Sequence, residues 1–203
     1  MTKEEFRTRI LHACDRVIAA EEELTDIDSR FGDADHGLTM TKICKSIRQA
    51  VEESDDGIQT MLDDAATAIL SLSGGSAVPL WNTWLDGMQE EAPEAEEIDI
   101  PGLKAAFANA LSEFADMSGA EVGDKTIMDA LKPASDAIEA YEGGDVQELF
   151  RKAAEAAAAG AEATKEFTAK YGRAKSYGAK TIGTPDCGAL SMSCFFAGLA
   201  DPV

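Results

Sequence analysis

Apolar residues recur every three or four positions along most of this chain of 203 residues, a spacing that is typical of amphipathic helices. No run of alternating β-branched residues indicates a strand. The pattern therefore predicts an all-α fold in a single domain, residues 1–203. Eight helices are expected, within residues 4–24, 38–51, 58–70, 80–88, 103–117, 128–138, 146–167 and 190–199.

Four of the breaks between these helices combine glycine with polar or charged residues. They contain the sequences GDADHG, SGGSA, GDKT and GTPDCG, and they lie within residues 25–37, 71–79, 118–126 and 171–188. Glycine lets a backbone approach a ligand closely, and the loops of a helical bundle can gather at one end. We therefore expect the chemistry in these loops. By contrast, the acidic, proline-bearing stretch 90–102 is typical of a solvated connector.

The chain is strongly acidic, with 38 Asp and Glu residues against 18 Lys and Arg residues and a formal net charge of −20. Nucleic acid and anionic membrane surfaces are therefore poor partners, because each needs a basic face. An anionic ligand would need metal ions to mediate its contact. A salt-rich environment would also favour such a surface, and this alternative stays open.

The remaining composition predicts a cytoplasmic protein without membrane spans. The first ten residues, MTKEEFRTRI, contain no apolar signal core, and no segment approaches the ~20 apolar residues of a spanning helix. The four cysteines, Cys14, Cys44, Cys187 and Cys194, form no CxxC pair. They are expected to be small buried apolar residues in a reducing compartment.

Three aspartates crowd the first of the four breaks. Asp28, Asp33 and Asp35 are spaced five and two residues apart around Gly32. Mg²⁺ takes oxygen ligands and is usually bound by one or two carboxylates together with substrate phosphates. The three aspartates could hold two such ions, whereas without cations they would repel one another and raise each other's pKa. Helix capping and turn formation are the alternative roles of aspartate, and Asp26 fits them.

Other polar residues in the breaks have a binding role and a structural role as alternatives. His36 suits a phosphate contact or a structural hydrogen bond. The SGGSA segment precedes a helix, whose N-terminal amides suit a phosphate. Lys125 offers positive charge or an ion pair, and Arg173 and Lys180 suit ligand binding or surface ion pairs. No P-loop, dinucleotide-binding or Ser-His-Asp pattern occurs. The residues by themselves thus indicate a helical bundle with a carboxylate–magnesium–phosphate site.

The loop sequences resemble one known family. LTDIDSRFGDADHGLTM, SGGSAVPLW, GAEVGDKTIMDALKPA and GRAKSYGAKTIGTPDCGALS are similar, in order and across essentially the whole chain, to segments of the nucleotide-binding L subunit of bacterial dihydroxyacetone kinase. The same module is the C-terminal domain of ATP-dependent dihydroxyacetone kinases. The resemblance implies an eight-helix antiparallel barrel or bundle, with the nucleotide site in the loops at one end.

The resemblance also implies the ligands and the residues that bind them. ADP or ATP would bind with two Mg²⁺ ions, which Asp28, Asp33 and Asp35 hold against the nucleotide phosphates. No residue of this chain is implied as catalytic, since the family binds its substrate covalently through a histidine of a separate K subunit. The implied nucleotide-binding residues are His36, Gly37, Leu38, Thr39, Ser76, Ala77, Ser118, Ile127, Arg173, Asp186, Cys187 and Gly188.

The implied activity is that of a glycerone (dihydroxyacetone) kinase-type phosphotransferase subunit, acting on dihydroxyacetone or a related small ketose. The implied partner is a K-type substrate-binding subunit. In one version of the family, a multiphosphoryl carrier of the phosphotransferase system recharges bound ADP. The chain is also a candidate homodimer. The alternative is a nucleotide-bearing regulatory module that partners a transcription factor and binds no nucleic acid itself.

The chain departs from the family's usual motifs in the phosphate-binding and final loops. Some departures replace glycines, a hydroxyl residue or an asparagine, and others replace an acid–arginine pair. The identity of the sugar therefore stays open, and a kinase for another small ketose or polyol-derived sugar is a further expectation. The positions concerned are Thr39, Ala77, Val78, Asn82, Ala179 and Lys180.

Overall fold

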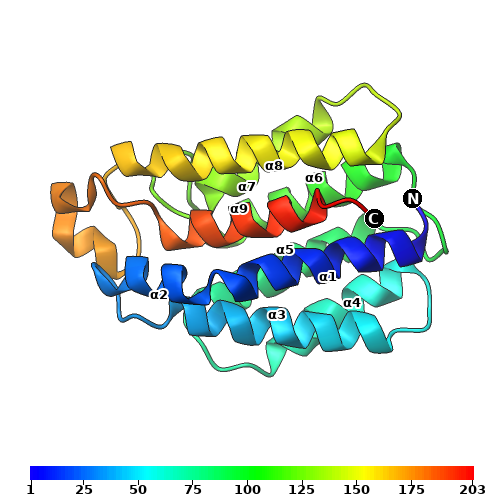
Figure 1. Ribbon diagram of the computed structural model, residues 1–203, viewed down its shortest axis with the longest axis horizontal. Helices are drawn as coiled ribbons and strands as arrows, with labels where there is room; N and C mark the ends of the chain where they lie inside the picture. Colours follow the sequence, from blue (N-terminus) through cyan, green and yellow to red (C-terminus); the bar gives the residue numbers. More distant parts are fainter.

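The computed structural model describes residues 1–203 and consists of helices and connecting loops (Figure 1). No β-strand forms, and the only extended pairing is an isolated bridge between Thr2 and Glu97. The all-α prediction is therefore confirmed. The elements are α1 (Lys3–Ala19), α2 (Glu21–Ser29), α3 (His36–Glu53), α4 (Ile58–Leu70), α5 (Ala77–Glu91), α6 (Ile100–Ser118), α7 (Met128–Glu139), α8 (Val146–Ala163), the 3-10 segments η1 (Thr164–Glu166) and η2 (Arg173–Thr181), and α9 (Cys187–Leu199).

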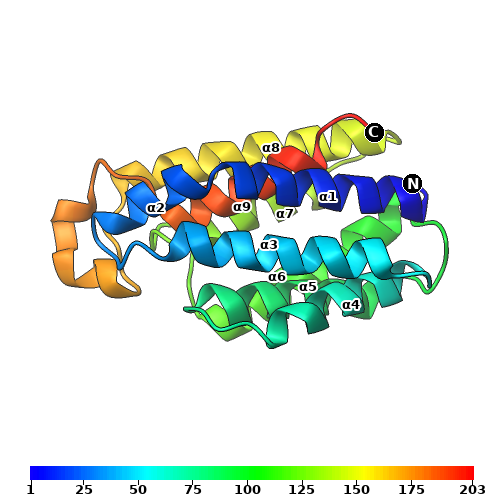
Figure 2. The ribbon, with the colours of Figure 1, turned by 60° about the horizontal axis from the view of Figure 1, so that its bottom comes forward.

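Successive long helices run in opposite directions along the long axis of the molecule (Figures 1 and 2). α1 runs toward the left of Figure 1, α3 returns, and the alternation continues to α9, so that both termini lie toward the right. The four glycine-rich breaks connect α2 to α3, α4 to α5, α6 to α7 and α8 to α9. All four therefore fall at the left-hand end, which we call the loop end.

The long helices pack in a closed cycle around one hydrophobic core. Each long helix contacts the next long helix in the chain, and α9 packs back against α1. The centre of the core is aromatic: the ring of Trp84 lies 5.6 Å from that of Trp81, 6.0 Å from Phe107 and 5.5 Å from Phe195. These edge-on contacts are the geometry that aromatic pairs favour. The packed interior fixes the helix ends from which the loops project.

The first predicted helix and the break after it need correction. The pattern predicts one helix over residues 4–24 and a break over 25–37, but the structure has two helices, and the second ends only at Ser29. Ala20 interrupts them with φ −88° and ψ 3°. Helical geometry then resumes because Ile27 keeps the apolar spacing and is buried. Burial thus outweighs the turn preference of aspartate, and the first aspartate of the triad lies on α2.

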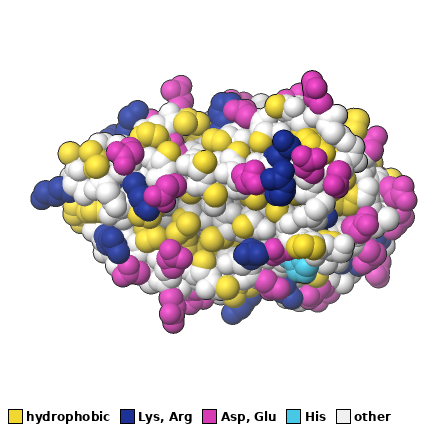
Figure 3. Space-filling model, turned by 45° about the horizontal axis from the view of Figure 1, so that its top comes forward, with side chains coloured by type: hydrophobic (Ala, Val, Ile, Leu, Met, Phe, Trp, Pro, Cys, Tyr) yellow, Lys and Arg dark blue, Asp and Glu magenta, His cyan; other side chains and the backbone are white.

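The surface of the loop end differs from that of the opposite end. On the face shown in Figure 3, hydrophobic side chains form the broadest patches on the left, whereas Asp and Glu dominate the right-hand edge. Most of the large hydrophobic side chains that are exposed belong to helix ends or loops of the loop end. These are Leu38, Leu70, Met117, Val122, Tyr171, Tyr177 and Ile182.

Two further expectations concern the membrane and the cysteines. None of the helices combines the length and the apolar character that crossing a membrane requires. Cys14 and Cys44 are buried as expected, but Cys187 and Cys194 are partly exposed. The expectation of fully buried cysteines is therefore wrong for these two, and Cys187 is only partly buried because it lines the cavity described below.

Gly198 sets the distance between α9 and α1. A Cβ atom at this position would lie 2.3 Å from Cα of Ala13 and 2.5 Å from its backbone nitrogen. A helix backbone cannot move aside as a flexible side chain can, so we expect Gly198→Ala to lower the free energy of unfolding by about 1–3 kcal/mol in urea denaturation. Gly144→Ala is the control, because a Cβ there meets nothing within 4 Å. Equal stability of the two variants would contradict the close packing.

Candidate functional site

A cavity of about 690 Å³ opens at the loop end of the molecule. All four glycine-rich breaks and the helix ends beside them contribute to its walls. All but two of the binding residues expected from the sequence line this cavity. They are Asp28, Asp33, Asp35, His36, Thr39, Ser76, Ala77, Ser118, Ile127, Arg173, Asp186, Cys187 and Gly188.

The two exceptions are Gly37 and Leu38, which lie outside the cavity lining. A Cβ atom on Gly37 would lie 2.1 Å from the carbonyl oxygen of Glu21, so this glycine lets α3 pack closely against α2. Leu38 is 49% exposed on the outer surface. A nucleotide contact by either residue stays a prediction that the cavity does not support.

The three aspartates meet at one side of the cavity. One carboxylate oxygen from each of Asp28, Asp33 and Asp35 lies within 4.8 Å of the others. Gly32 makes room for this arrangement, because a Cβ there would lie 2.0 Å from Oδ1 of Asp28. Clustered carboxylate oxygens that remain open to solvent are the ligands that Mg²⁺ prefers. The donor set therefore fits the expected metal ions.

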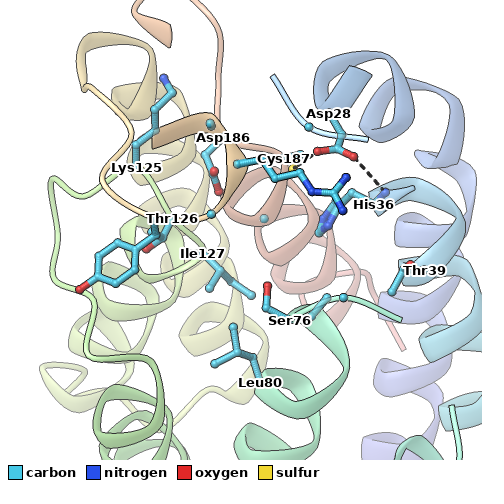
Figure 4. Close-up of a pocket in the computed structure, with 18 of the residues that line it drawn as sticks. Asp28, His36, Thr39, Ser76, Leu80, Lys125, Thr126, Ile127, Asp186 and Cys187 are labelled. Atoms are coloured by element: carbon cyan, nitrogen blue, oxygen red, sulfur yellow. Dashed lines mark hydrogen bonds between the residues drawn. The ribbon is translucent and has the colours of Figure 1, made fainter. Parts of the chain in front are cut away.

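Backbone amides at the start of α3 orient the first carboxylate. Oδ2 of Asp28 accepts hydrogen bonds from the backbone nitrogens of Asp35 at 3.0 Å and His36 at 3.3 Å (Figure 4). Oδ1 of the same carboxylate lies 3.9 Å from Sγ of Cys187, at the start of α9. Asp28 thus sits between two helix N-termini, whose partial positive charge favours a carboxylate.

Repulsion within the triad affects its proton affinity. Burial, followed by the carboxylates of Asp33 and Asp28, raises the pKa of Asp35. The guanidinium of Arg173 forms an ion pair with Asp33 and supplies one compensating positive charge. The structure therefore shows Arg173 both in the cavity wall and in an ion pair, and its partner is an expected metal ligand.

His36 joins α3 to α9. Burial lowers the pKa of His36, so its ring is neutral at neutral pH. Its Nε2 lies 3.2 Å from Oγ of Ser191, whose hydroxyl in turn donates to the carbonyl oxygen of Gly188 at 2.9 Å. Because that hydroxyl carries one proton, we assign Nε2 as the donor to it. The structural role considered for this histidine is therefore present, in a side chain that also lines the cavity.

The GDKT break folds around a buried carboxylate. Asp129, in the first turn of α7, accepts hydrogen bonds from the backbone nitrogens of Gly123 at 2.6 Å and Thr126 at 2.7 Å. Between them, Lys125 adopts a positive φ of 60°. The ammonium of Lys125 donates to the backbone carbonyls of Thr164 and Thr184. The ion pair considered for Lys125 does not form, because no carboxylate lies within ion-pair distance.

Residues 167–184, which we call the lid, project beyond the helix ends (Figure 1). The sequence predicts a break over residues 171–188, and within it the structure forms the 3-10 segment η2. The ring of Tyr177 lies 5.2 Å from that of Phe31, and the hydroxyl of Tyr171 donates to the carbonyl of Gly119 at 2.7 Å. These contacts hold the lid against two other breaks. Three lid glycines have positive φ, which other residues rarely adopt: Gly172, Gly178 and Gly183.

The start of α9 carries less negative charge than its sequence suggests. Asp186 caps this helix, its Oδ2 accepting from the backbone nitrogen of Ala189 at 2.8 Å. Burial nevertheless raises the pKa of Asp186 to about 7. Burial also raises the pKa of the Cys187 thiol, which therefore stays protonated at neutral pH. This wall repels an anionic ligand less than its sequence suggests.

The cavity also has an apolar wall, of which the sequence analysis expected only Ile127. Leu80, Trp81 and Met117 line it together with Ile127, and Figure 4 places Leu80 and Ile127 away from Asp28. The helical spacing of these residues is the same as that of interior residues. No sequence signal therefore separated them from the core.

Most departures from the family's usual motifs lie away from the cavity. Val78, Ala179 and Lys180 are not part of its lining, and Nδ2 of Asn82 donates to the carbonyl of Ala66 on α4 at 2.9 Å. Thr39 and Ala77 are the two departures that line the cavity.

Comparisons with known proteins agree with the resemblance seen in the loops. The DAK2 domain matches residues 30–201. The ADP-binding subunit DhaL of PEP-dependent dihydroxyacetone kinase 2 from Listeria innocua is 31% identical over 173 residues, which cover 83% of this chain and 80% of the relative. D-erythrulose kinase from Mycolicibacterium smegmatis is 32% identical over 189 residues, 91% of this chain but 33% of the relative. The chain spans about a third of the length of the first curated relatives it matches.

The fold is also shared with a solved structure. Dihydroxyacetone kinase from C. freundii, in complex with AMP-PNP and Mg²⁺, superposes with a TM-score of 0.72 at 21% identity. The similarity covers 96% of this chain and 33% of that chain. At this level of identity the likeness establishes the common helical fold.

Asp35 offers a test of repulsion in the triad. A carboxyl whose pKa is higher in the folded than in the unfolded protein costs stability at any pH where the unfolded chain has lost its proton, above about 4. We expect Asp35→Asn to raise Tm at pH 7 in buffer free of divalent cations, and to bring no gain at pH 3. Asp63→Asn, on the exposed face of α4, is the control. An equal effect of Asp35→Asn at both pH values would contradict the repulsion.

Proposed function

The chain belongs to the DAK2 domain family, and on this premise we propose that it is the nucleotide-binding subunit of a dihydroxyacetone kinase-type phosphotransferase. It binds ADP or ATP with two Mg²⁺ ions at Asp28, Asp33 and Asp35. With a K-type partner that holds the substrate, it transfers a phosphoryl group to dihydroxyacetone or a related small ketose, such as an erythrulose.

The observation that carries this proposal is the division of the cavity into two walls. The carboxylate wall suits metal-bound phosphates, because hard cations are bound by carboxylates and phosphate oxygens together. The apolar wall, which includes Leu80 and Ile127, suits a flat base. Asp28, Asp33 and Asp35 would hold Mg²⁺, which would supply positive charge that neutralises the phosphates.

The chain's own residues orient the nucleotide and supply no nucleophile. Ser76 precedes α5, whose N-terminal amides suit a phosphate, and a Cβ on the adjacent Gly75 would meet nothing within 4 Å. Arg173 is placed to exchange its contact with Asp33 for a phosphate contact when metal binds the triad. Phosphoryl transfer depends mainly on such positioning and charge neutralisation.

The exposed hydrophobic side chains support a protein partner at the loop end. Tyr171 and Tyr177 on the lid and Met117 at the end of α6 are at least 42% exposed beside the cavity mouth. Apolar and aromatic residues around a cavity mouth are typical of an interface that excludes water. A K-type subunit docked there would bring its substrate to the transferable phosphate. A carrier protein that recharges bound ADP would need the same face.

The first test of this function removes one metal ligand. We expect Asp33→Ala to weaken ADP binding at least tenfold in calorimetric titrations with Mg²⁺, because phosphates and the remaining carboxylates then repel one another. Asp26→Ala is the matched control: Asp26 lies seven residues earlier, is exposed and pairs only with Arg30. An unchanged affinity of Asp33→Ala for ADP at equal Mg²⁺ would refute the assignment of Asp33 as a metal ligand.

The second test concerns the route of the phosphoryl group. Because transfer is direct, we expect no stable phosphate on His36 after incubation with Mg·ATP, a K-type subunit and dihydroxyacetone. Phosphopeptide mapping under conditions that preserve phosphohistidine makes the measurement. Stoichiometric phosphate on His36 would replace direct transfer by a covalent intermediate on this chain.

A further inference from the structure

Lys125 is the buried cation of the loop end. Its side chain is 5% exposed, and its ammonium contacts two backbone carbonyls and no carboxylate. Burial lowers the pKa of Lys125. In Figure 4 the ammonium points up and away from Ser76 and Asp28, toward the loop above the cavity. Lys125 is among the residues that line the cavity, but its ammonium is directed away from the carboxylate wall and from the start of α5.

The two carbonyls that Lys125 contacts flank the base of the lid, by which we mean the place where the chain enters and leaves it. Thr164 follows the last residue of α8, and Thr184 is the last residue of the lid. Two further hydrogen bonds close the same base: the backbone nitrogen of Gly183 donates to the carbonyl of Lys165 at 2.7 Å, and that of Ala169 donates to Oγ1 of Thr181 at 3.1 Å. Lys170 also joins the lid to the GDKT loop, since its backbone nitrogen and its ammonium donate to Asp124 at 3.1 and 2.6 Å. Lys125 differs in that one side chain bonds the carbonyls on both sides of the lid.

The base of the lid is joined to the start of α9. Oγ1 of Thr164 accepts a hydrogen bond from the backbone nitrogen of Asp186 at 2.8 Å. Two residues later, a Cβ on Gly188 would lie 3.4 Å from Ile127, so α9 begins in contact with the GDKT loop. A shift of Thr164 would therefore move the cavity wall that Asp186, Cys187 and Gly188 form.

We propose that Lys125 is a positioning residue, which holds the lid base and the start of α9 in the geometry that the nucleotide needs. It acts on the ligand through Thr164 and Thr184, without touching the phosphates. Its effect on nucleotide binding rests on the function proposed above, whereas its effect on the lid does not. Without the ammonium, the carbonyl of Thr184 loses its partner and that of Thr164 keeps only the backbone nitrogen of Phe167, at 3.1 Å, which favours a local opening of the lid base.

The experiment compares Lys125→Met with a matched control. Methionine keeps the length of the side chain and removes the donors. Lys104→Met is the control, because the ammonium of Lys104 also donates to a backbone carbonyl, that of Glu139 at 2.8 Å, but this hydrogen bond is exposed to solvent and far from the cavity. Two measurements are made well below the unfolding midpoint of each variant: trypsin cleavage at the exposed Lys175 and Lys180 of the lid in the free protein, and affinity for ADP and adenosine with Mg²⁺.

We expect Lys125→Met to speed lid cleavage about tenfold and to weaken ADP binding about tenfold, with Lys104→Met close to wild type in both. Wild-type cleavage together with wild-type affinity would reduce Lys125 to a stabilising residue and overturn the proposal. Wild-type cleavage with weakened binding of ADP but not of adenosine would make it a direct phosphate ligand and also overturn it. Failure of the wild-type protein to bind ADP would refute the proposed function, while the cleavage rates would still decide whether Lys125 holds the lid.

Discussion

Three carboxylates held within 4.8 Å of one another are the constraint on which the loop end depends. Like charges at this separation repel, so the surrounding structure supplies compensation. Backbone amides at the start of α3 donate hydrogen bonds to Asp28, and the guanidinium of Arg173 forms an ion pair with Asp33. Gly32 leaves the space that the Asp28 carboxylate occupies. A protein that served stability alone would gain nothing from this cluster. Its presence is understandable where cations and phosphates complete the charge balance.

The two ends of the bundle use their scarce cations differently. At the end with the termini, Lys3 donates to the carbonyls of Asp55 and Asp56, and Arg9 donates to the carbonyl of Leu199. These contacts satisfy carbonyls at chain turns and at the end of a helix. At the loop end Lys125 has the same chemistry, but the carbonyls belong to the base of the lid. Both ends thus use hydrogen bonds from a basic side chain to backbone carbonyls. These bonds cap chain turns at one end and position the cavity wall at the other.

Much of the site was predictable because it lies in the breaks of a regular pattern. The carboxylate spacing around Gly32 and the glycine-rich SGGSA and GDKT segments stood out against amphipathic helices, and these segments line the cavity. The apolar wall was not predictable, since Leu80 and Trp81 have the spacing of interior residues. The sequence analysis considered Lys125 as a positive charge or an ion-pair partner, but its actual contacts were not predictable, because backbone carbonyls leave no signature in a sequence.

The sequence by itself determined the helices, their apolar faces and the residues that interrupt them, because these depend on local spacing and on backbone preference. It failed at Ala20 and Ile27, where burial against other helices extended helical structure into a segment rich in aspartate. Only the tertiary structure decided which breaks share an end of the bundle and which side chains face the cavity. The reason is physical: both outcomes follow from contacts between residues far apart in the chain, such as Lys125 with Thr184 and Arg173 with Asp33.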